Sequence, residues 1–106
     1  MKLSIILNTN DPETAWNGLR LGNEVLSRGN EASVFLLGKG VEIENIRHDV
    51  FDVAYELEKF TSGGGRMLAC GTCLKVRQQQ AGVCPVSTMA ELANLVLDSD
   101  KVVTLG

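Results

Sequence analysis

Short runs of apolar residues alternate along this chain with segments in which apolar residues recur every three or four positions. Such runs are typical of buried strands, and the longer spacing is typical of amphipathic helices. The runs predict five strands, at Lys2–Leu7, Ala32–Leu37, Arg66–Ala69, Val83–Val86 and Lys101–Leu105. The helical spacing predicts four helices, at about residues 12–28, 49–60, 73–80 and 89–97. Strict alternation of strand and helix favours an α/β domain with a mostly parallel sheet and helices on both faces.

Several residues indicate where these helices begin and end. Asp11 precedes a proline and predicts an N-cap, and Gly29 predicts the end of the first helix. Thr88, followed three residues later by Glu91, matches a capping box for the fourth helix. Pro85 lacks a backbone N–H, so the fourth strand is expected at a sheet edge.

The second helix is expected to begin at Asp49, directly after the only histidine, His48. Its apolar face is predicted to comprise Phe51, Ala54, Leu57 and Phe60, with the acidic residues opposite. Two glycine-containing segments, at residues 38–40 and 62–65, are predicted to be connections within one domain that spans residues 1–106.

Composition narrows the class of protein. Of the 106 residues, 44% are hydrophobic and 22% are charged, which is ordinary for a globular domain. The formal net charge of −3 does not favour binding to nucleic acid or to an anionic membrane. The apolar stretch at the N-terminus is too short for a signal peptide, and no segment approaches a membrane helix. We therefore expect a cytoplasmic protein.

A cysteine pair, Cys70 and Cys73, stands where the third strand gives way to a helix. Backbone N–H groups at a helix start favour a thiolate, the form of cysteine that attacks, carries sulfur, closes a disulfide or binds metal. Cys70 ends the strand and has the strongest claim to this activation, and Cys73 is near enough to form a disulfide with it. Arg77 and its basic neighbours would add positive charge.

Ligands of parallel sheets bind at the carboxyl ends of the strands, where the cysteine pair is expected to lie. Other candidate pocket residues come from the same ends of the predicted strands: Asn8, Asn10, Gly38, Gly40, Gly71, Thr72 and Ser87. Cys84 could approach Cys70 if the third and fourth strands are neighbours. Its alternative role is that of a small buried apolar side chain.

The sequence does not favour three other classes of site. Zinc would need Cys70, Cys73, Cys84 and His48 together, and the spacing lacks a second Cys-x-x-Cys, so no metal or other cofactor is assigned. A thioredoxin fold would place the cysteine pair after an early strand, opposite a proline distant in the sequence. Here the pair follows the third predicted strand, and Pro85 lies in the next strand. No phosphate-binding glycine motif is present.

The chain resembles the DsrE/DsrF-like family of small sulfur-relay proteins, which have the YchN-type fold. The resemblance rests on the strand and polar loop at Leu3–Asn10, on Gly40-Val41, on Cys70 closing a strand seven residues before Arg77, and on the ending at residues 97–103. The segment 69–75, Ala-Cys-Gly-Thr-Cys-Leu-Lys, is similar to that of a small stand-alone branch of the family.

The resemblance implies a three-layer α/β/α fold with a five-stranded parallel sheet, assembled as a homotrimer or homohexamer. It also implies that Cys70 accepts sulfane sulfur as a persulfide from a donor protein and passes it to an acceptor protein, as a possible sulfurtransferase would. Cys73 departs from the relay members, and it could instead resolve the persulfide. Two alternatives stay open: a thiol–disulfide redox or sensing protein that uses Cys70 and Cys73, and a non-enzymatic module that binds a small ligand or metal.

Overall fold

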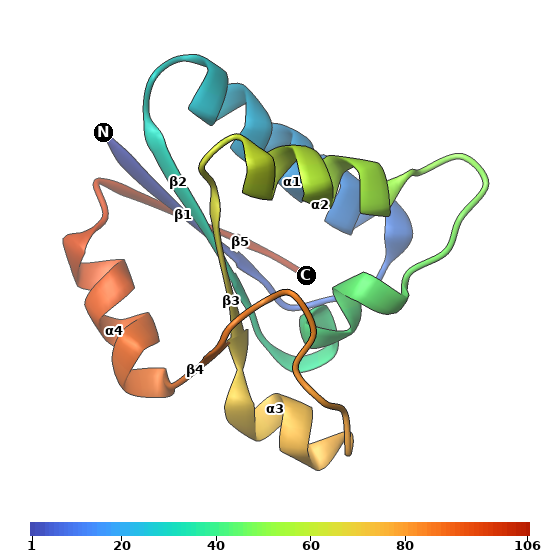
Figure 1. Cartoon of the computed structure of the whole chain (residues 1–106). Coiled ribbons are helices and arrows are strands. Elements are labelled where there is room, and N and C mark those ends of the chain that lie inside the picture. The colour runs from blue at the N-terminus through green and yellow to red at the C-terminus, as the bar shows by residue number, and fades with distance from the viewer.

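The computed structural model describes all 106 residues and contains a five-stranded sheet, four α-helices and one 3₁₀-helix, η1 (Figure 1). The elements in chain order are β1 (Lys2–Leu7), α1 (Pro12–Ser27), β2 (Glu31–Leu36), η1 (Gly38–Asn45), α2 (Val53–Ser62), β3 (Arg66–Cys70), α3 (Gly71–Val76), β4 (Val86–Ser87), α4 (Met89–Asp98) and β5 (Lys101–Leu105).

All five strands are parallel, in the spatial order β4-β3-β2-β1-β5. The chain therefore builds the sheet outward from β1 through β4 and then returns to the free edge of β1 with β5. The predicted α/β architecture is confirmed, including the edge position of the strand that follows Pro85. All carboxyl ends of the strands lie at one end of the sheet, where α3 begins (Figure 1).

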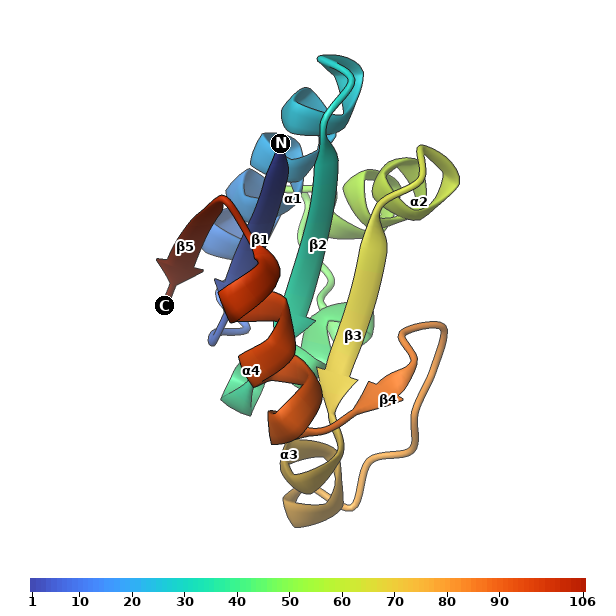
Figure 2. The ribbon, with the colours of Figure 1, turned by 90° about the vertical axis from the view of Figure 1, so that its left-hand side faces the viewer.

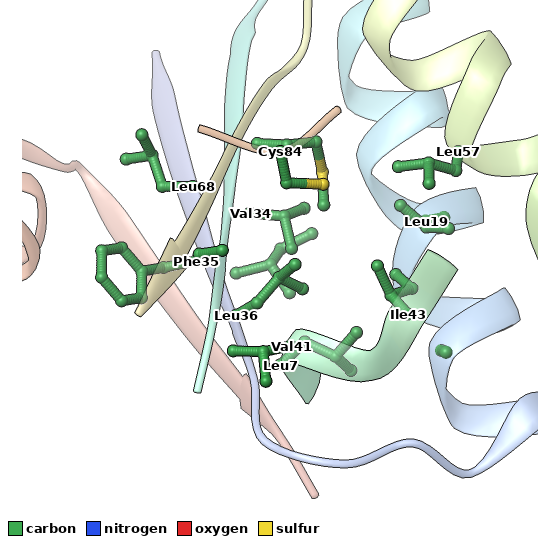
Figure 3. Close-up of a cluster of buried hydrophobic side chains, with 14 of the residues drawn as sticks. Leu7, Leu19, Val34, Phe35, Leu36, Val41, Ile43, Leu57, Leu68 and Cys84 are labelled. Atoms are coloured by element: carbon green, nitrogen blue, oxygen red, sulfur yellow. The ribbon is translucent and has the colours of Figure 1, made fainter. Parts of the chain in front are cut away.

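Helices cover both faces of the sheet, as predicted (Figure 2). Helices α1 and α2 pack side by side on one face, whereas α4 crosses the other face alone. Side chains of a strand alternate between the two faces. Val34 and Leu36 accordingly point toward α1 and α2, whereas Phe35 and Leu68 point to the side of α4 (Figure 3).

The two helices on the first of these faces, α1 and α2, pack closely against each other. Phe60 of α2 is fully buried, and a Cβ atom at Gly22 of α1 would lie 2.6 Å from its ring. Glycine at position 22 therefore allows the two helices to approach. Beside this contact, the amide of Asn23 donates hydrogen bonds to the backbone carbonyl and the carboxylate of Glu56. The polar side chains buried between α1 and α2 thus have partners.

Helix α2 begins later than predicted. Asp52, not Asp49, is its N-cap, and the Asp52 carboxylate accepts a hydrogen bond from the N–H of Tyr55. His48 lies in the loop before this helix, where its Nδ1 accepts N–H groups of two following residues. The buried face of α2 consists of Val53, Glu56, Leu57 and Phe60, so the predictions for Phe51 and Ala54 are wrong.

Three further boundaries differ around the carboxyl end of the sheet. Helix α3 ends at Val76 rather than Gln80, because Gln78 adopts a left-handed backbone conformation with φ of 51°. The predicted loop at Gly38–Gly40 begins the 3₁₀-helix η1. The fourth strand lies at Val86–Ser87, three residues beyond the predicted start, because the N–H of Ala69 bonds to the carbonyl of Pro85 and sets the register.

None of the helices has both the length and the apolar character needed to cross a membrane.

Candidate functional site

The two cysteines of the pair meet at the turn between β3 and α3. Cys70 is the last residue of β3 and the N-cap of α3, and its Sγ accepts the backbone N–H of Cys73 at 3.4 Å. Both residues line the same pocket. Cα atoms three residues apart in a helical turn are separated by about 5 Å, a distance that a disulfide can span. The local geometry therefore permits both thiol exchange and disulfide formation.

The sulfur of Cys73 has a separate partner across the site. Its Sγ accepts the backbone N–H of Gly38 at 3.2 Å. Gly38 has φ of 51°, and a Cβ atom there would lie 2.3 Å from Oδ1 of Asn8. A side chain at position 38 would thus be strained and would clash, so this N–H group is held in place by the glycine.

Both thiols open into one pocket of about 440 Å³ at the carboxyl ends of β2, β3 and β4. Its nine lining residues are Leu37, Cys70, Gly71, Thr72, Cys73, Val86, Ser87, Thr88 and Met89. None of these side chains carries a charge. Three of the predicted pocket residues, Gly71, Thr72 and Ser87, lie here beside the cysteines.

Sequence reasoning missed four lining residues: Leu37, Val86, Thr88 and Met89. Leu37 directly follows β2, and Thr88 and Met89 directly follow β4, so the rule that placed the other candidates at strand ends could have found them. Val86 was assigned to the fourth strand, but its place beside Gly71 depends on the register of that strand.

Burial governs the acidity of Cys70. It raises the pKa of the Cys70 thiol above its ordinary value, and the neighbouring Cys73 thiol acts in the same direction. The N–H groups of Cys73 and Thr72 oppose this effect, as expected for the start of a helix, but they do not outweigh it. The net stabilisation of a Cys70 thiolate that the sequence predicted is therefore not observed.

The positive charge expected from Arg77 is largely compensated. Its Nε lies 3.1 Å from a carboxylate oxygen of Glu42, and its Nη1 donates to the backbone carbonyl of Cys73 at 3.2 Å. Gln79 makes a similar bridge, because its amide donates to the carbonyl of Val41 at 2.8 Å. Arg77 thus ties α3 to η1, and it acts on the backbone at Cys73 rather than on the sulfur.

Cys84 lies away from the pair, although β3 and β4 are neighbours. It is 1% exposed and packs with Val34 and Leu57 on the face covered by α1 and α2 (Figure 3). Side chains alternate along β3, so Cys70 points to the same face of the sheet as Leu68. That face is covered by α4 and lies opposite the face that holds Cys84. Burial, helped by the carboxylate of Glu44, raises the pKa of Cys84 to about 12.

The other predicted pocket residues do not line the cysteine pocket. Asn8 lies next to Gly38, and its Oδ1 occupies the space that a Cβ atom at position 38 would need. Gly40 is buried where a Cβ atom would come within 2.1 Å of the carbonyl of Leu7. Asn10 borders a smaller pocket of about 180 Å³ together with Glu42 and Arg47.

No three side chains from histidine, cysteine, aspartate or glutamate come together in a metal-binding arrangement. Cys70 and Cys73 offer two sulfur ligands, Cys84 lies on the other face of the sheet, and His48 lies in the loop before α2. A zinc site built from these four residues is not assembled.

A second pocket, of about 410 Å³, lies between α4 and the opposite ends of the strands. Its walls include Ser4, Ser33, Arg66, Glu91 and Asp98. It contains no cysteine or histidine, and it lies far from the carboxyl ends at which parallel sheets place their sites. The cysteine pocket is therefore the stronger candidate for the functional site.

Comparison with known proteins identifies the family. Residues 1–105 match the DsrE/DsrF-like family. An uncharacterized protein of Methanocaldococcus jannaschii is 31% identical over 114 aligned positions, which cover 98% of this chain and 99% of that protein. The match extends over the whole sheet, including the strand that ends in Cys70. The chain belongs to the DsrE/DsrF-like family.

Proposed function

We propose that this protein relays sulfur in the cytoplasm, accepting sulfane sulfur as a persulfide on Cys70 and passing it to a partner protein. The observation that supports this most strongly is the meeting of two free thiols in one uncharged pocket at the carboxyl end of β3, in a chain of the DsrE/DsrF-like family. A reducing compartment suits such a role, because the thiols must be free to accept the next sulfur atom.

The chemistry requires no cofactor. A cysteine thiolate attacks the outer sulfur of a donor persulfide, the sulfur–sulfur bond of the donor breaks, and the donor leaves as a thiolate. The protein then holds one extra sulfur atom on its own cysteine. An acceptor thiolate removes that atom by the same step, so the protein ends unchanged and acts as a sulfurtransferase.

Intact-protein mass spectrometry tests this proposal directly. The reduced protein is incubated with a persulfide donor, freed of excess reagent and weighed. We expect wild type to gain the mass of one sulfur atom, which a thiol reductant then removes. The Cys70→Ser variant should not retain this sulfur to the same extent. Cys84→Ser is the matched control and should load like wild type, because Cys84 lies outside the pocket. The relay is refuted if wild type gains no sulfur or if Cys70→Ser retains as much.

A second candidate is thiol–disulfide redox or sensing chemistry. The observation that favours it is the proximity of Cys70 and Cys73, which line one pocket and are joined by the hydrogen bond from the Cys73 N–H to the Cys70 sulfur. Equilibration in glutathione buffers of defined potential measures how readily the pair oxidises. A disulfide that forms near the cytosolic potential, without any gain of sulfur from persulfides, would favour redox chemistry over relay.

Self-association is also part of the proposal, as a trimer or hexamer that meets separate donor and acceptor proteins. Large apolar side chains are exposed at the mouth of the cysteine pocket, at Val86 and Met89, and on α4 at Leu97, which is 82% exposed. Burial of such side chains is a general driving force for association. Light scattering at micromolar concentration tests this, and a monomer would contradict it.

A further inference from the structure

We propose that Cys73 is the thiol that first takes sulfur from the donor and that the sulfur atom then moves from Cys73 to Cys70 inside the pocket. This order rests on the proposed function and assigns separate tasks to the two cysteines. Cys73 becomes the loading residue and Cys70 the holding residue.

The two sulfurs differ in how accessible they are to a donor. Cys70 is only 6% exposed, because it ends a buried strand and belongs to the hydrophobic core. Cys73 is partly exposed and projects from α3, the short helix at the outer end of the sheet. A donor persulfide held on another molecule must bring its outer sulfur into line with the attacking thiolate. The more exposed Cys73 meets that requirement without any opening of the fold.

A fixed hydrogen bond from Gly38 is a second feature of Cys73. The N–H of Gly38 points at Sγ of Cys73, and the glycine cannot be replaced by a residue with a side chain without a clash with Asn8. An N–H group aimed at a sulfur stabilises the negative charge that this atom gains when it leaves. This suits a residue that is loaded by the donor and is then displaced. The burial that raises the pKa of Cys70 makes that residue a poorer first attacker at neutral pH.

The transfer between the two cysteines balances without an oxidant or reductant. In the first step the Cys73 thiolate attacks the outer sulfur of the donor persulfide, the donor's sulfur–sulfur bond breaks, and the donor thiolate leaves. In the second step Cys70 loses its proton and attacks the outer sulfur of the Cys73 persulfide. The bond from Cys73 Sγ to that sulfur breaks, and Cys73 leaves as a thiolate that can take the proton from Cys70. One sulfur atom has moved, and the oxidation states are unchanged.

The competing attack has a different product. If Cys70 attacks the inner sulfur, Sγ of Cys73, a Cys70–Cys73 disulfide forms and the outer sulfur leaves as hydrosulfide. The two thiols are then oxidised and the sulfane sulfur is reduced. Mass spectrometry separates the two routes, because relay adds the mass of one sulfur atom whereas disulfide closure removes two hydrogens.

Rapid-quench loading tests the order. Reduced wild type, Cys70→Ser and Cys73→Ser are mixed with cysteine persulfide, stopped with an alkylating reagent at a series of times, and digested to locate the added sulfur. We expect sulfur on Cys73 first and on Cys70 later in wild type. Cys70→Ser should load Cys73 at the wild-type rate but lose that sulfur faster once the donor is removed, because no holding thiol receives it from the more exposed Cys73. Cys73→Ser should load Cys70 about tenfold or more slowly.

Controls separate chemistry from folding. Serine at position 73 can still accept the N–H of Gly38, so Cys73→Ser should keep the fold, and circular dichroism with thermal unfolding checks this. Cys73→Ala is the second variant, and its loading should be slow in the same way. The order is overturned if Cys73→Ser loads as fast as wild type or if the earliest wild-type sulfur lies on Cys70. If none of the proteins gains sulfur, the relay function itself fails, and this order fails with it.

Discussion

The two faces of the sheet differ in how completely helices cover them. On one face α1 buries five residues and α2 buries four, and the two helices meet closely at Gly22 and Phe60. On the other face α4 lies alone and buries only Leu92. Each face also holds one fully or nearly buried cysteine, Cys84 on the first and Cys70 on the second.

This difference separates stability from chemistry. Cys84 is part of the core under two helices, whereas Cys70 lines a pocket at the carboxyl ends of the strands, where we expect it to react.

Cysteine reactivity should divide most sharply between the faces. A pKa of about 12 instead of 9.0 leaves Cys84 with about a thousandfold less thiolate at pH 8, and burial shields its sulfur further. Treatment of the native protein with iodoacetamide, followed by peptide mass mapping, should modify Cys73 and leave Cys84 free. Cys84 should react after denaturation. Equal labelling of Cys73 and Cys84 in the native protein would show that α1 and α2 do not shield Cys84 from the reagent.

Removal of the Phe60 ring should cost more stability than any truncation on α4. Phe60 is fully buried between α1 and α2, so Phe60→Ala should lower the free energy of unfolding by about 3–5 kcal/mol. Tyr55→Ala, in the same helix but 59% exposed, is the matched control and should change it by about 0.5 kcal/mol or less. Urea unfolding followed by circular dichroism measures both. Similar losses for the two variants would contradict the packing described for this face.

Truncation on α4 should be less costly. Leu92→Ala should lower the free energy of unfolding by about 2–3 kcal/mol, at the low end for leucine, because the thinly covered face can relax around the gap. Leu97→Ala in the same helix should have almost no effect, because Leu97 is exposed. A loss for Leu92→Ala as large as that for Phe60→Ala would mean that the two faces are equally well packed.

The cap of α4 should have a still smaller effect. Oγ1 of Thr88 accepts the N–H of Glu91 at 3.2 Å, and Thr88→Ala should cost about 1 kcal/mol of unfolding free energy. Thr88→Ser keeps the accepting oxygen and should restore most of it. If serine and alanine are equally destabilising, the hydrogen bond is not what holds the start of this helix.

Acid should weaken the cap of α1 by a small amount. The N–H and hydroxyl of Thr14 hold the pKa of Asp11 below its ordinary value of 3.8. The stability from the ionised cap is therefore fully present above pH 3.8, and it is lost as the pH falls through the lower folded value. Asp11→Asn keeps a capping oxygen without this titration. Its unfolding free energy should change less than that of wild type between pH 5 and pH 2, and an unchanged slope would contradict the assignment.

The sequence predicted the fold because local patterns and global architecture agree. β1 and β5 were placed at their observed bounds, and the caps at Asp11 and Thr88 stand where their side-chain chemistry indicated. The errors arose where tertiary contacts decide. Asp49 and Asp52 are both acceptable caps by residue type, and the packing of Val53 against the core selects the second.

The candidate site was predictable in position but not in its electrostatics. Cys70 at a strand end is visible in the sequence, and so is the proximity of Cys73. The Gly38 N–H on Cys73 joins residues 35 positions apart, and the pairing of Arg77 with Glu42 spans the same distance. Burial of Cys70 likewise depends on the tertiary fold, and it reverses the direction of the pKa shift that the start of a helix alone would give.

The order of the strands has a consequence for synthesis on the ribosome. β2, β3 and β4 each add to the outer edge of a sheet that the nascent chain has already built, whereas β5 returns to β1, the first strand to be made. The second edge of β1 therefore stays open until β5 has been made, because no earlier segment pairs with it. A chain truncated before Lys101 would contain every residue of the cysteine pocket but would leave that edge of β1 permanently unpaired.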